Sequence, residues 1–129
     1  MLKICTVYFG DLYTPDYVEK LFSSIRRNSS IRFQSVCISD NPNVKADLVL
    51  PYNHHSDVKK HWHKLKFFSP HFADQHPGDD IIVMDIDQVI TNNINDLIGH
   101  PVNNNELVTY GIWWESLLDT NGGFYKFKS

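Results

Sequence analysis

Two acidic residues, Asp85 and Asp87, directly follow the most apolar run of the chain, residues 81–84. In extended backbone, side chains at positions i and i+2 point to the same side, so both carboxylates can face one ligand. Hard divalent cations prefer such oxygen ligands and are usually completed by water and substrate phosphates. Asp85 and Asp87 are therefore candidate ligands of a cation that neutralises a leaving diphosphate. The alternative is a plain turn after a strand, where aspartate is common.

The elements that must position these carboxylates follow from the spacing of apolar residues. Strands are expected at the short apolar runs 4–9, 33–39, 47–50, 81–84, 107–114 and 123–127. Helices are expected where apolar residues recur at helical spacing, at 15–27, from about 56 to 68, and at 93–98. Strands that alternate with helices predict one α/β domain over residues 1–129, with a mostly parallel sheet flanked by helices on both faces.

Three predicted strands end in residues that could bind a ligand. Phe9 and Gly10 lie at the end of the first strand, Asp40 follows the second, and Asp85 and Asp87 follow the strand at 81–84. Ligands of parallel sheets collect beyond the carboxyl ends of the strands. We therefore expect these residues to converge on one edge of the sheet.

The segment from 61 to 98 resembles the glycosyltransferases of the GT-A fold, and most of all their glycogenin-like and lipopolysaccharide galactosyltransferase-like group with its bacterial and viral relatives. Those proteins carry a Trp-x-Lys-Leu-x-x-Phe-x-Pro helix, an apolar strand, Asp-x-Asp, and an Asn-Ile-x-Asp-Leu segment. The matching residues here are Trp62, Lys64, Leu65, Phe68, Pro70, Asp85, Asp87, Asn93, Ile94, Asp96 and Leu97. Near the end, residues 121–124 resemble the Asn-Ser-Gly-Val strand entry of the same group.

The resemblance implies a single minimal GT-A, Rossmann-like domain that lacks most of the acceptor-binding half. It implies a metal-dependent hexosyltransferase that uses a UDP-sugar donor and an unknown acceptor, with slow donor hydrolysis as a further reaction. Asp85 and Asp87 would hold Mn²⁺ or Mg²⁺ at the catalytic centre, with Asp85 also near the ribose. Lys64 would reach the sugar or the diphosphate, unless it is a solvated helix lysine.

The resemblance also assigns residues to the nucleotide base. The loop that contains Tyr8, Phe9 and Tyr13 would receive the base by stacking and backbone contacts. Asp40 would accept the uracil N–H. Each assignment has an alternative, since Tyr8 or Phe9 could equally belong to the core and Asp40 could be a turn residue.

The sequence departs from the group in its last third. The third metal ligand of the group, a histidine in a His-x-x-Gly-x-x-Lys motif, has no counterpart before Ser129. We therefore expect a minimal enzyme, a fragment or a degenerate binding module. Glu115 and Asp119, in a predicted loop beside the tryptophans at 113 and 114, are candidate catalytic carboxylates for an inverting mechanism. The resemblance slightly favours a retaining mechanism, and the stereochemistry stays open.

Two other functions compete with hexosyl transfer. A nucleotide-sugar binding module would bind UDP and metal without turnover. A phosphohydrolase of the haloacid-dehalogenase type also places Asp-x-Asp after an apolar strand, but its motif lies near the N-terminus and continues to threonine, whereas Gln88 and Val89 follow here. A structural zinc site is not expected, since His61 and His63 do not share a helix face.

Composition argues against further classes of protein. The net charge of −3, with scattered lysines and arginines, argues against nucleic-acid binding. No apolar run approaches the roughly 20 residues of a membrane-spanning helix, and the first residues do not read as a signal peptide. The expected compartment is a reducing cytoplasm, with Cys5 and Cys37 as buried thiols. The short length, 129 residues, makes a homodimer attractive for additional burial.

Overall fold

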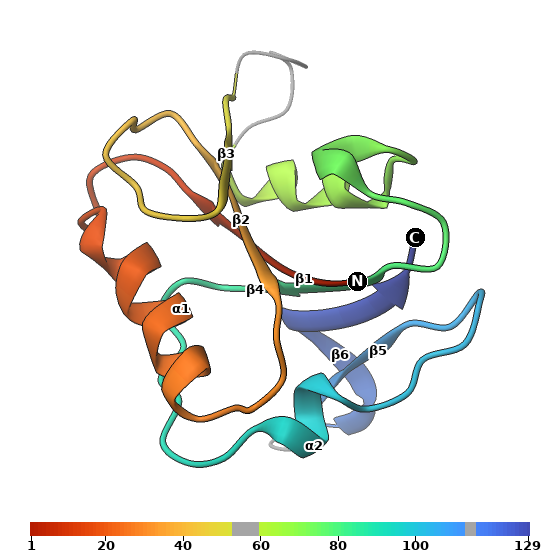
Figure 1. The fold of residues 1–129 in the computed structure, drawn as a ribbon. Coiled ribbons are helices and arrows are strands. Elements are labelled where there is room, and N and C mark those ends of the chain that lie inside the picture. The colour runs from red at the N-terminus through yellow and green to blue at the C-terminus, as the bar shows by residue number, and fades with distance from the viewer. Residues whose placement is uncertain (53–59, 113–115) are drawn as a thin grey trace.

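A six-stranded sheet in the order β3-β2-β1-β4-β6-β5 forms the centre of the computed structural model, which describes residues 1–52, 60–112 and 116–129 (Figure 1). The side chains of 60–61, 112 and 116–121 lie outside that description. The strands are β1 (Leu2–Tyr8), β2 (Gln34–Ser39), β3 (Leu48–Leu50), β4 (Asp80–Met84), β5 (Val108–Ile112) and β6 (Ser116–Lys128). β1 is parallel to β2 and β4, and β2 to β3, whereas β6 is antiparallel to β4 and β5. The predicted mostly parallel α/β sheet is confirmed, with antiparallel strands at one edge.

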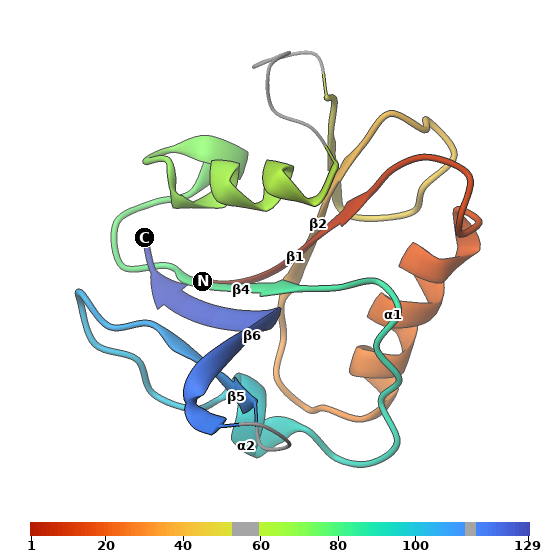
Figure 2. The same cartoon turned by 180° about the vertical axis from the view of Figure 1, so that it is seen from behind.

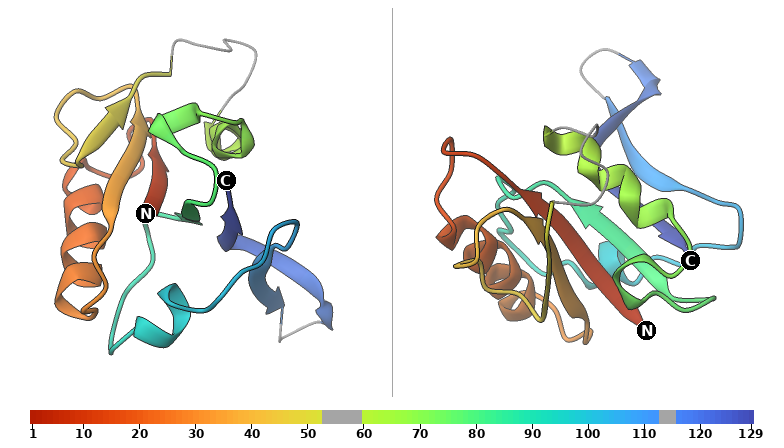
Figure 3. Two further views of the ribbon diagram at one scale, coloured as in Figure 1. Left: turned by 45° about the vertical axis from the view of Figure 1, so that its right-hand side comes forward. Right: turned by 90° about the horizontal axis from the view of Figure 1, so that it is seen from above.

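Helical segments cover both faces of this sheet, as the alternation of elements predicts. They are α1 (Asp16–Arg27), η1 (Lys60–Phe68), η2 (Phe72–Asp74) and α2 (Asn95–Ile98). Figure 3 shows α1 and η1 on opposite sides of the parallel strands. Seen from behind, in Figure 2, β5 and β6 lie next to α2. The turn that follows β4 contacts both layers, since Ile86 packs in the cluster that contains α1 and Asp85 pairs with Lys64 of η1.

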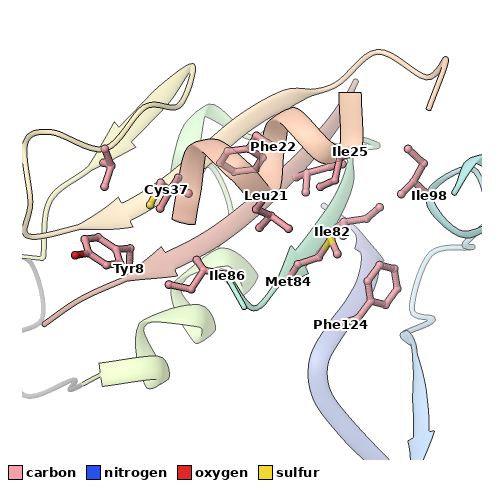
Figure 4. Packing of buried hydrophobic residues seen from close by; sticks show 13 residues of the cluster. Tyr8, Leu21, Phe22, Ile25, Cys37, Ile82, Met84, Ile86, Ile98 and Phe124 are labelled. Atoms are coloured by element: carbon pink, nitrogen blue, oxygen red, sulfur yellow. The ribbon is translucent and has the colours of Figure 1, made fainter. Parts of the chain in front are cut away.

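Helix α1 packs on the sheet through an apolar stripe. Its buried residues recur at helical spacing and are Val18, Leu21, Phe22 and Ile25. Figure 4 shows Leu21, Phe22 and Ile25 in one cluster with Ile82 and Met84 of β4. Acidic residues in the first turn and Arg26 and Arg27 in the last turn complement the helix dipole. The carboxyl end of β4 is thus fixed against a well-packed layer.

The two cysteines lie on opposite faces of the sheet. Cys5 belongs to the core cluster that includes Phe67 of η1, and Cys37 to the cluster that includes α1. Both thiols are free and buried, and burial raises the pKa of Cys5 and raises the pKa of Cys37 to about 12. Although β1 and β2 are neighbours, the sheet itself separates the two sulfur atoms.

Two expectations differ from the structure. The helix predicted from about 56 to 68 is a 3₁₀ helix over Lys60–Phe68, and residues 56–59 lie outside the described part. The predicted loop around Asp119 is wrong, because β6 already begins at Ser116 and pairs Gly111 with Thr120. The register between β5 and β6 shifts between Thr109 and Tyr110, which pair with Tyr125 and Asn121, so the Asn-Gly-Gly sequence forms an irregularity within the strand.

A buried lysine ties β6 to the chain that follows α2. Lys126 is 1% exposed, and its Nζ donates to the carbonyl oxygens of Ile98 at 2.8 Å and His100 at 2.7 Å. The same ammonium lies 3.3 Å from the Asp80 carboxylate. Lys128 pairs with Asp80 at 2.6 Å, but its side chain is 30% exposed. These two lysines share one carboxylate in very different environments.

We expect Lys126→Met to lower the free energy of unfolding by about 2–4 kcal/mol, since it removes a buried ammonium that donates to the Ile98 and His100 carbonyls and pairs with Asp80. Lys128→Met removes a partly exposed ion pair with the same carboxylate and is expected to cost about 0–1 kcal/mol. Chemical denaturation of the two variants measures the difference. Equal losses would contradict a structural role for the buried ammonium.

Candidate functional site

Asp85 and Asp87 reach one cavity at the carboxyl end of β4. A turn begins at Ile86, whose side chain is buried in the core beside Met84 and Tyr8, as Figure 4 shows. The two flanking carboxylates are left partly or fully exposed. Both line a cavity of about 180 Å³, together with Val7, Phe9, Leu12, Tyr13, Lys64 and Ile86. The predicted convergence of the two carboxylates therefore holds although the backbone there is a turn rather than a strand.

Lys64 joins η1 to this cavity. Its ammonium forms an ion pair with the Asp85 carboxylate, and it also donates to the carbonyl oxygen of Gly122 in β6 at 3.3 Å. The Lys64 side chain is 14% exposed, against 40% for Asp85. Lys64 is thus held at the site by two elements rather than solvated on the helix surface. Its positive charge lies where an anionic ligand of the cavity would be stabilised.

Tyr13 bridges the loop after β1 to the second carboxylate. Its hydroxyl donates to Asp87 at 3.3 Å, and the negative charge of Asp87 raises the pKa of the Tyr13 phenol. Gly10, with φ 68°, takes a left-handed conformation that glycine adopts without a Cβ penalty, which lets the loop turn back. Tyr8 stabilises the loop that follows β1, since its hydroxyl donates to the Tyr13 carbonyl at 2.8 Å and its side chain is buried in the core.

The structure brings together five of the predicted site residues: Phe9, Tyr13, Lys64, Asp85 and Asp87. Tyr8 is placed in the core, 2% exposed, where it positions the loop. Asp40 is exposed just after β2, which is a neighbour of β1, and it does not line this cavity.

Two other predicted residues are not tested by the structure. Glu115 lies outside the described residues, as do the tryptophans at 113 and 114. Asp119 lies within β6, and its side chain is outside the description. Their catalytic role stays a prediction.

Some residues that shape the site are not predicted from the sequence. Leu12, 85% exposed, lines the cavity, and no pattern in the sequence marks it. Gln88 donates from its side-chain amide to the Gly123 carbonyl, and the Asp85 amide donates to the same oxygen at 3.1 Å. The resemblance of residues 121–124 to a strand entry is the sequence feature that indicates this part of β6. These contacts fasten the turn after β4 to β6.

A second, larger cavity lies across the Lys64–Asp85 pair. Its volume is about 510 Å³, and it is lined by Trp62, Lys64, Leu65, Asp85, Gly122, Gly123 and Tyr125. Lys64 and Asp85 line both cavities, so their ion pair forms the boundary between them. A ligand that extends along this edge of the sheet would pass the charged boundary.

The carboxylates fit half of a site for a hard divalent cation. Mg²⁺ in enzymes is commonly held by one or two carboxylates plus substrate phosphates, and carboxylates equally suit Mn²⁺. Among residues 1–52, 60–112 and 116–129, no three His, Cys, Asp or Glu side chains are grouped to hold a metal ion. Asp85 and Asp87 would therefore depend on water and a diphosphate to complete the coordination.

Comparison with known proteins identifies a solved structure with a similar fold. No protein-family model and no curated protein matches the sequence. Among solved structures, the chain is similar to the apo form of the glycosyltransferase GlyE of Streptococcus pneumoniae TIGR4, with a TM-score of 0.62 and 16% sequence identity. The match covers 98% of this chain and 34% of that one, so the chain spans about a third of the length of GlyE.

At this identity the similarity establishes the fold: the chain has a glycosyltransferase-like α/β fold. Over the described ranges, no helix is both long enough and apolar enough to span a bilayer.

Proposed function

We propose that the chain binds a UDP-hexose with Mn²⁺ or Mg²⁺ and transfers the hexose to an acceptor. One observation carries the proposal: Asp85, Asp87 and Lys64 line a single cavity at the carboxyl edge of the parallel strands. Carboxylates for a cation and an ammonium for an anion are the set that a metal-bound diphosphate requires. The glycosyltransferase-like fold and the sequence resemblance support the same assignment.

Each side chain of the site has a role in this proposal. Asp85 and Asp87 hold the cation, which supplies the positive charge that neutralises the leaving diphosphate. Lys64 adds a point charge beside the same diphosphate. Phe9 and Tyr13 offer rings against which the base can stack.

The donor is too large for the first cavity alone. Ligand pockets usually measure about 300–1,000 Å³, whereas the cavity beside Tyr13 measures about 180 Å³. We assign the nucleotide to this cavity and the hexose to the cavity of about 510 Å³ beyond the Lys64–Asp85 pair. Asp40, exposed just after β2, stays a candidate acceptor for the uracil N–H.

The reaction joins an acceptor oxygen to the anomeric carbon of the hexose. The bond between that carbon and the diphosphate oxygen breaks, and the diphosphate leaves with the electron pair. The acceptor hydroxyl loses its proton to a carboxylate or to water. Glu115 and Asp119 are the candidates for that carboxylate if the reaction inverts, and water in place of the acceptor gives donor hydrolysis.

A half-site predicts strong coupling between metal and nucleotide. We expect Mn²⁺ alone to bind weakly, and UDP to bind about 5- to 150-fold more tightly with Mn²⁺ than without it. The physical reason is that the diphosphate supplies oxygen ligands to the cation, whereas the described residues offer no group of three His, Cys, Asp or Glu side chains to hold it. Isothermal titration calorimetry with UDP, in Mn²⁺ and in a chelator, measures the ratio. Equal affinities would contradict a shared site.

A donor panel tests the proposed function. The chain is incubated with Mn²⁺ and UDP-, GDP- or ADP-hexoses, and binding and free nucleotide are measured. Release from a UDP-hexose supports the transferase. Binding without release would instead support a nucleotide-sugar binding module, and phosphate release from simple phosphomonoesters a phosphohydrolase. The absence of both binding and release would contradict the proposal.

A further inference from the structure

The 3₁₀ helix η1 carries an exposed apolar stripe, defined as Trp62, Leu65 and Phe68. Their exposed fractions are 58%, 54% and 46%. They are spaced three residues apart, and a 3₁₀ helix has about 3.0 residues per turn, so these side chains lie above one another. The departure from the expected α-helical spacing thus concentrates three large apolar side chains on one line.

The apolar stripe is continuous with the second cavity. Trp62 and Leu65 line that cavity together with Tyr125. The ring of Phe68 stacks on Tyr125, with centroids 5.4 Å apart, and on Phe127, with centroids 4.3 Å apart. An apolar surface therefore runs from the cavity outward along η1 and β6.

The opposite end of the same cavity is charged. Lys64 and Asp85 form its boundary with the first cavity, and the Gly122 carbonyl accepts a hydrogen bond from Lys64. The cavity thus offers hydrogen-bonding groups at one end, where the donor hexose is assigned, and large apolar side chains at the other. Burying sugar hydroxyls against apolar side chains costs free energy when they find no hydrogen-bond partner. A sugar therefore gains most at the charged end, and the end lined by large apolar side chains favours an apolar group.

We propose that the apolar stripe binds the acceptor, and that the acceptor is a glycoside with an apolar aglycone, either an alkyl chain or an aryl ring. Its hydroxyl lies toward the Lys64–Asp85 boundary, where it attacks the anomeric carbon as the diphosphate leaves with the electron pair. The aglycone covers Trp62 and Leu65. This inference rests on the proposed function, and it names the substrate class of the same site.

The volume and the exposure support this assignment. The cavity of about 510 Å³ falls within the usual range for small-molecule pockets, about 300–1,000 Å³. Contiguous exposed apolar patches on a protein commonly mark binding sites. Here the patch begins at the very cavity that contains Asp85, so one ligand can cover the apolar stripe and reach the reacting centre.

The test compares acceptors that differ only in the aglycone. Methyl, octyl and phenyl glycosides of each hexose are supplied with Mn²⁺ and the UDP-hexose that the chain hydrolyses, with the octyl compounds below their critical micelle concentration. We expect kcat/KM for transfer to rise about tenfold or more from the methyl to the octyl or phenyl glycoside. Equal values, or transfer to none of them, would overturn the inference.

A matched pair of leucine variants locates the effect. Leu65→Ser is expected to reduce the octyl-to-methyl preference several-fold. Leu107→Ser makes the same change at a leucine of nearly equal exposure, 55% against 54%, that lines neither cavity, and should keep the preference. Loss of the preference in both variants, or in neither, would contradict binding at the apolar stripe. The wild-type comparison of aglycones decides the question even if a variant does not fold.

Donor hydrolysis separates this inference from the proposed function. Nucleotide release without acceptor reports the donor site alone. Release combined with indifference to the aglycone would remove the acceptor assignment and leave the transferase. Absence of both donor binding and release would remove the transferase itself, and the acceptor assignment with it.

Discussion

Asp87→Asn is expected to lower nucleotide release from the UDP-hexose by about 100- to 1,000-fold. The change removes one of the two negative charges that hold the cation, and loss of one preorganised electrostatic contact commonly costs that much in kcat. The amide keeps the size of the side chain and can still accept the Tyr13 hydrogen bond. Because Asp87 is exposed, the free energy of unfolding should change by less than about 0.5 kcal/mol.

The control is the same substitution at another exposed aspartate. Asp96 lies in the first turn of α2 and lines neither cavity. Asp96→Asn should leave nucleotide release within about twofold of the unmodified chain, since it removes an exposed charge that lines neither cavity and is screened by salt. Coupled-enzyme detection of UDP gives both rates. Full activity in Asp87→Asn would contradict the role of the carboxylate.

Lys64→Ala is expected to change metal binding and turnover in opposite directions. The Lys64 ammonium shares Asp85 with the proposed cation, and a unit charge would repel a divalent cation about 4 Å away by about 2 kcal/mol in water. Removing that repulsion should tighten the binding of Mn²⁺ alone by about 30-fold. Turnover of the UDP-hexose should fall by about 10- to 100-fold, because the leaving diphosphate loses a positive partner.

A distant lysine controls for net charge in this experiment. Lys45 is 73% exposed, pairs with Glu19, and lines neither cavity. Lys45→Ala removes the same charge from the protein and should leave Mn²⁺ affinity and turnover within about twofold. Calorimetry gives the affinities, and UDP release gives the rates. Weaker Mn²⁺ binding in Lys64→Ala would mean that the lysine and the cation do not share Asp85.

The parts of the site that the sequence predicts are those encoded by local spacing. Asp85 and Asp87 follow a short apolar run, and the strand at 81–84 proves to be β4 almost to the residue. Lys64 is found because the resemblance covers η1 and the turn after β4 together. For these residues, the pattern predicts where the strand and the helical segment lie, although η1 is a 3₁₀ helix and the backbone after β4 is a turn.

The parts that the sequence does not predict depend on contacts between distant segments. Tyr8 lies between Val7 and Phe9 in an apolar run that fits the cavity or the core. Only the packing against Ile86 and α1 places it in the core. The length of β6 follows from its pairing with both β4 and β5, and β4 is distant from it in the sequence. The second cavity forms only where η1 and β6 lie side by side, and no local sequence pattern predicts that arrangement.

A homodimer and a cytoplasmic location stay predictions from the sequence, and neither enters the account of the site.

Paramagnetic broadening by Mn²⁺ tests the central claim most directly. In the presence of UDP, trace Mn²⁺ should broaden first the backbone amide signals of Asp85, Asp87 and Gly122, and the effect should be lost in Asp87→Asn. Two of these amides belong to the carboxylate residues that line the first cavity, and the third belongs to Gly122, whose carbonyl accepts a hydrogen bond from Lys64. Broadening centred on another surface, such as that around His71 and His76, would contradict a cation site at the end of β4.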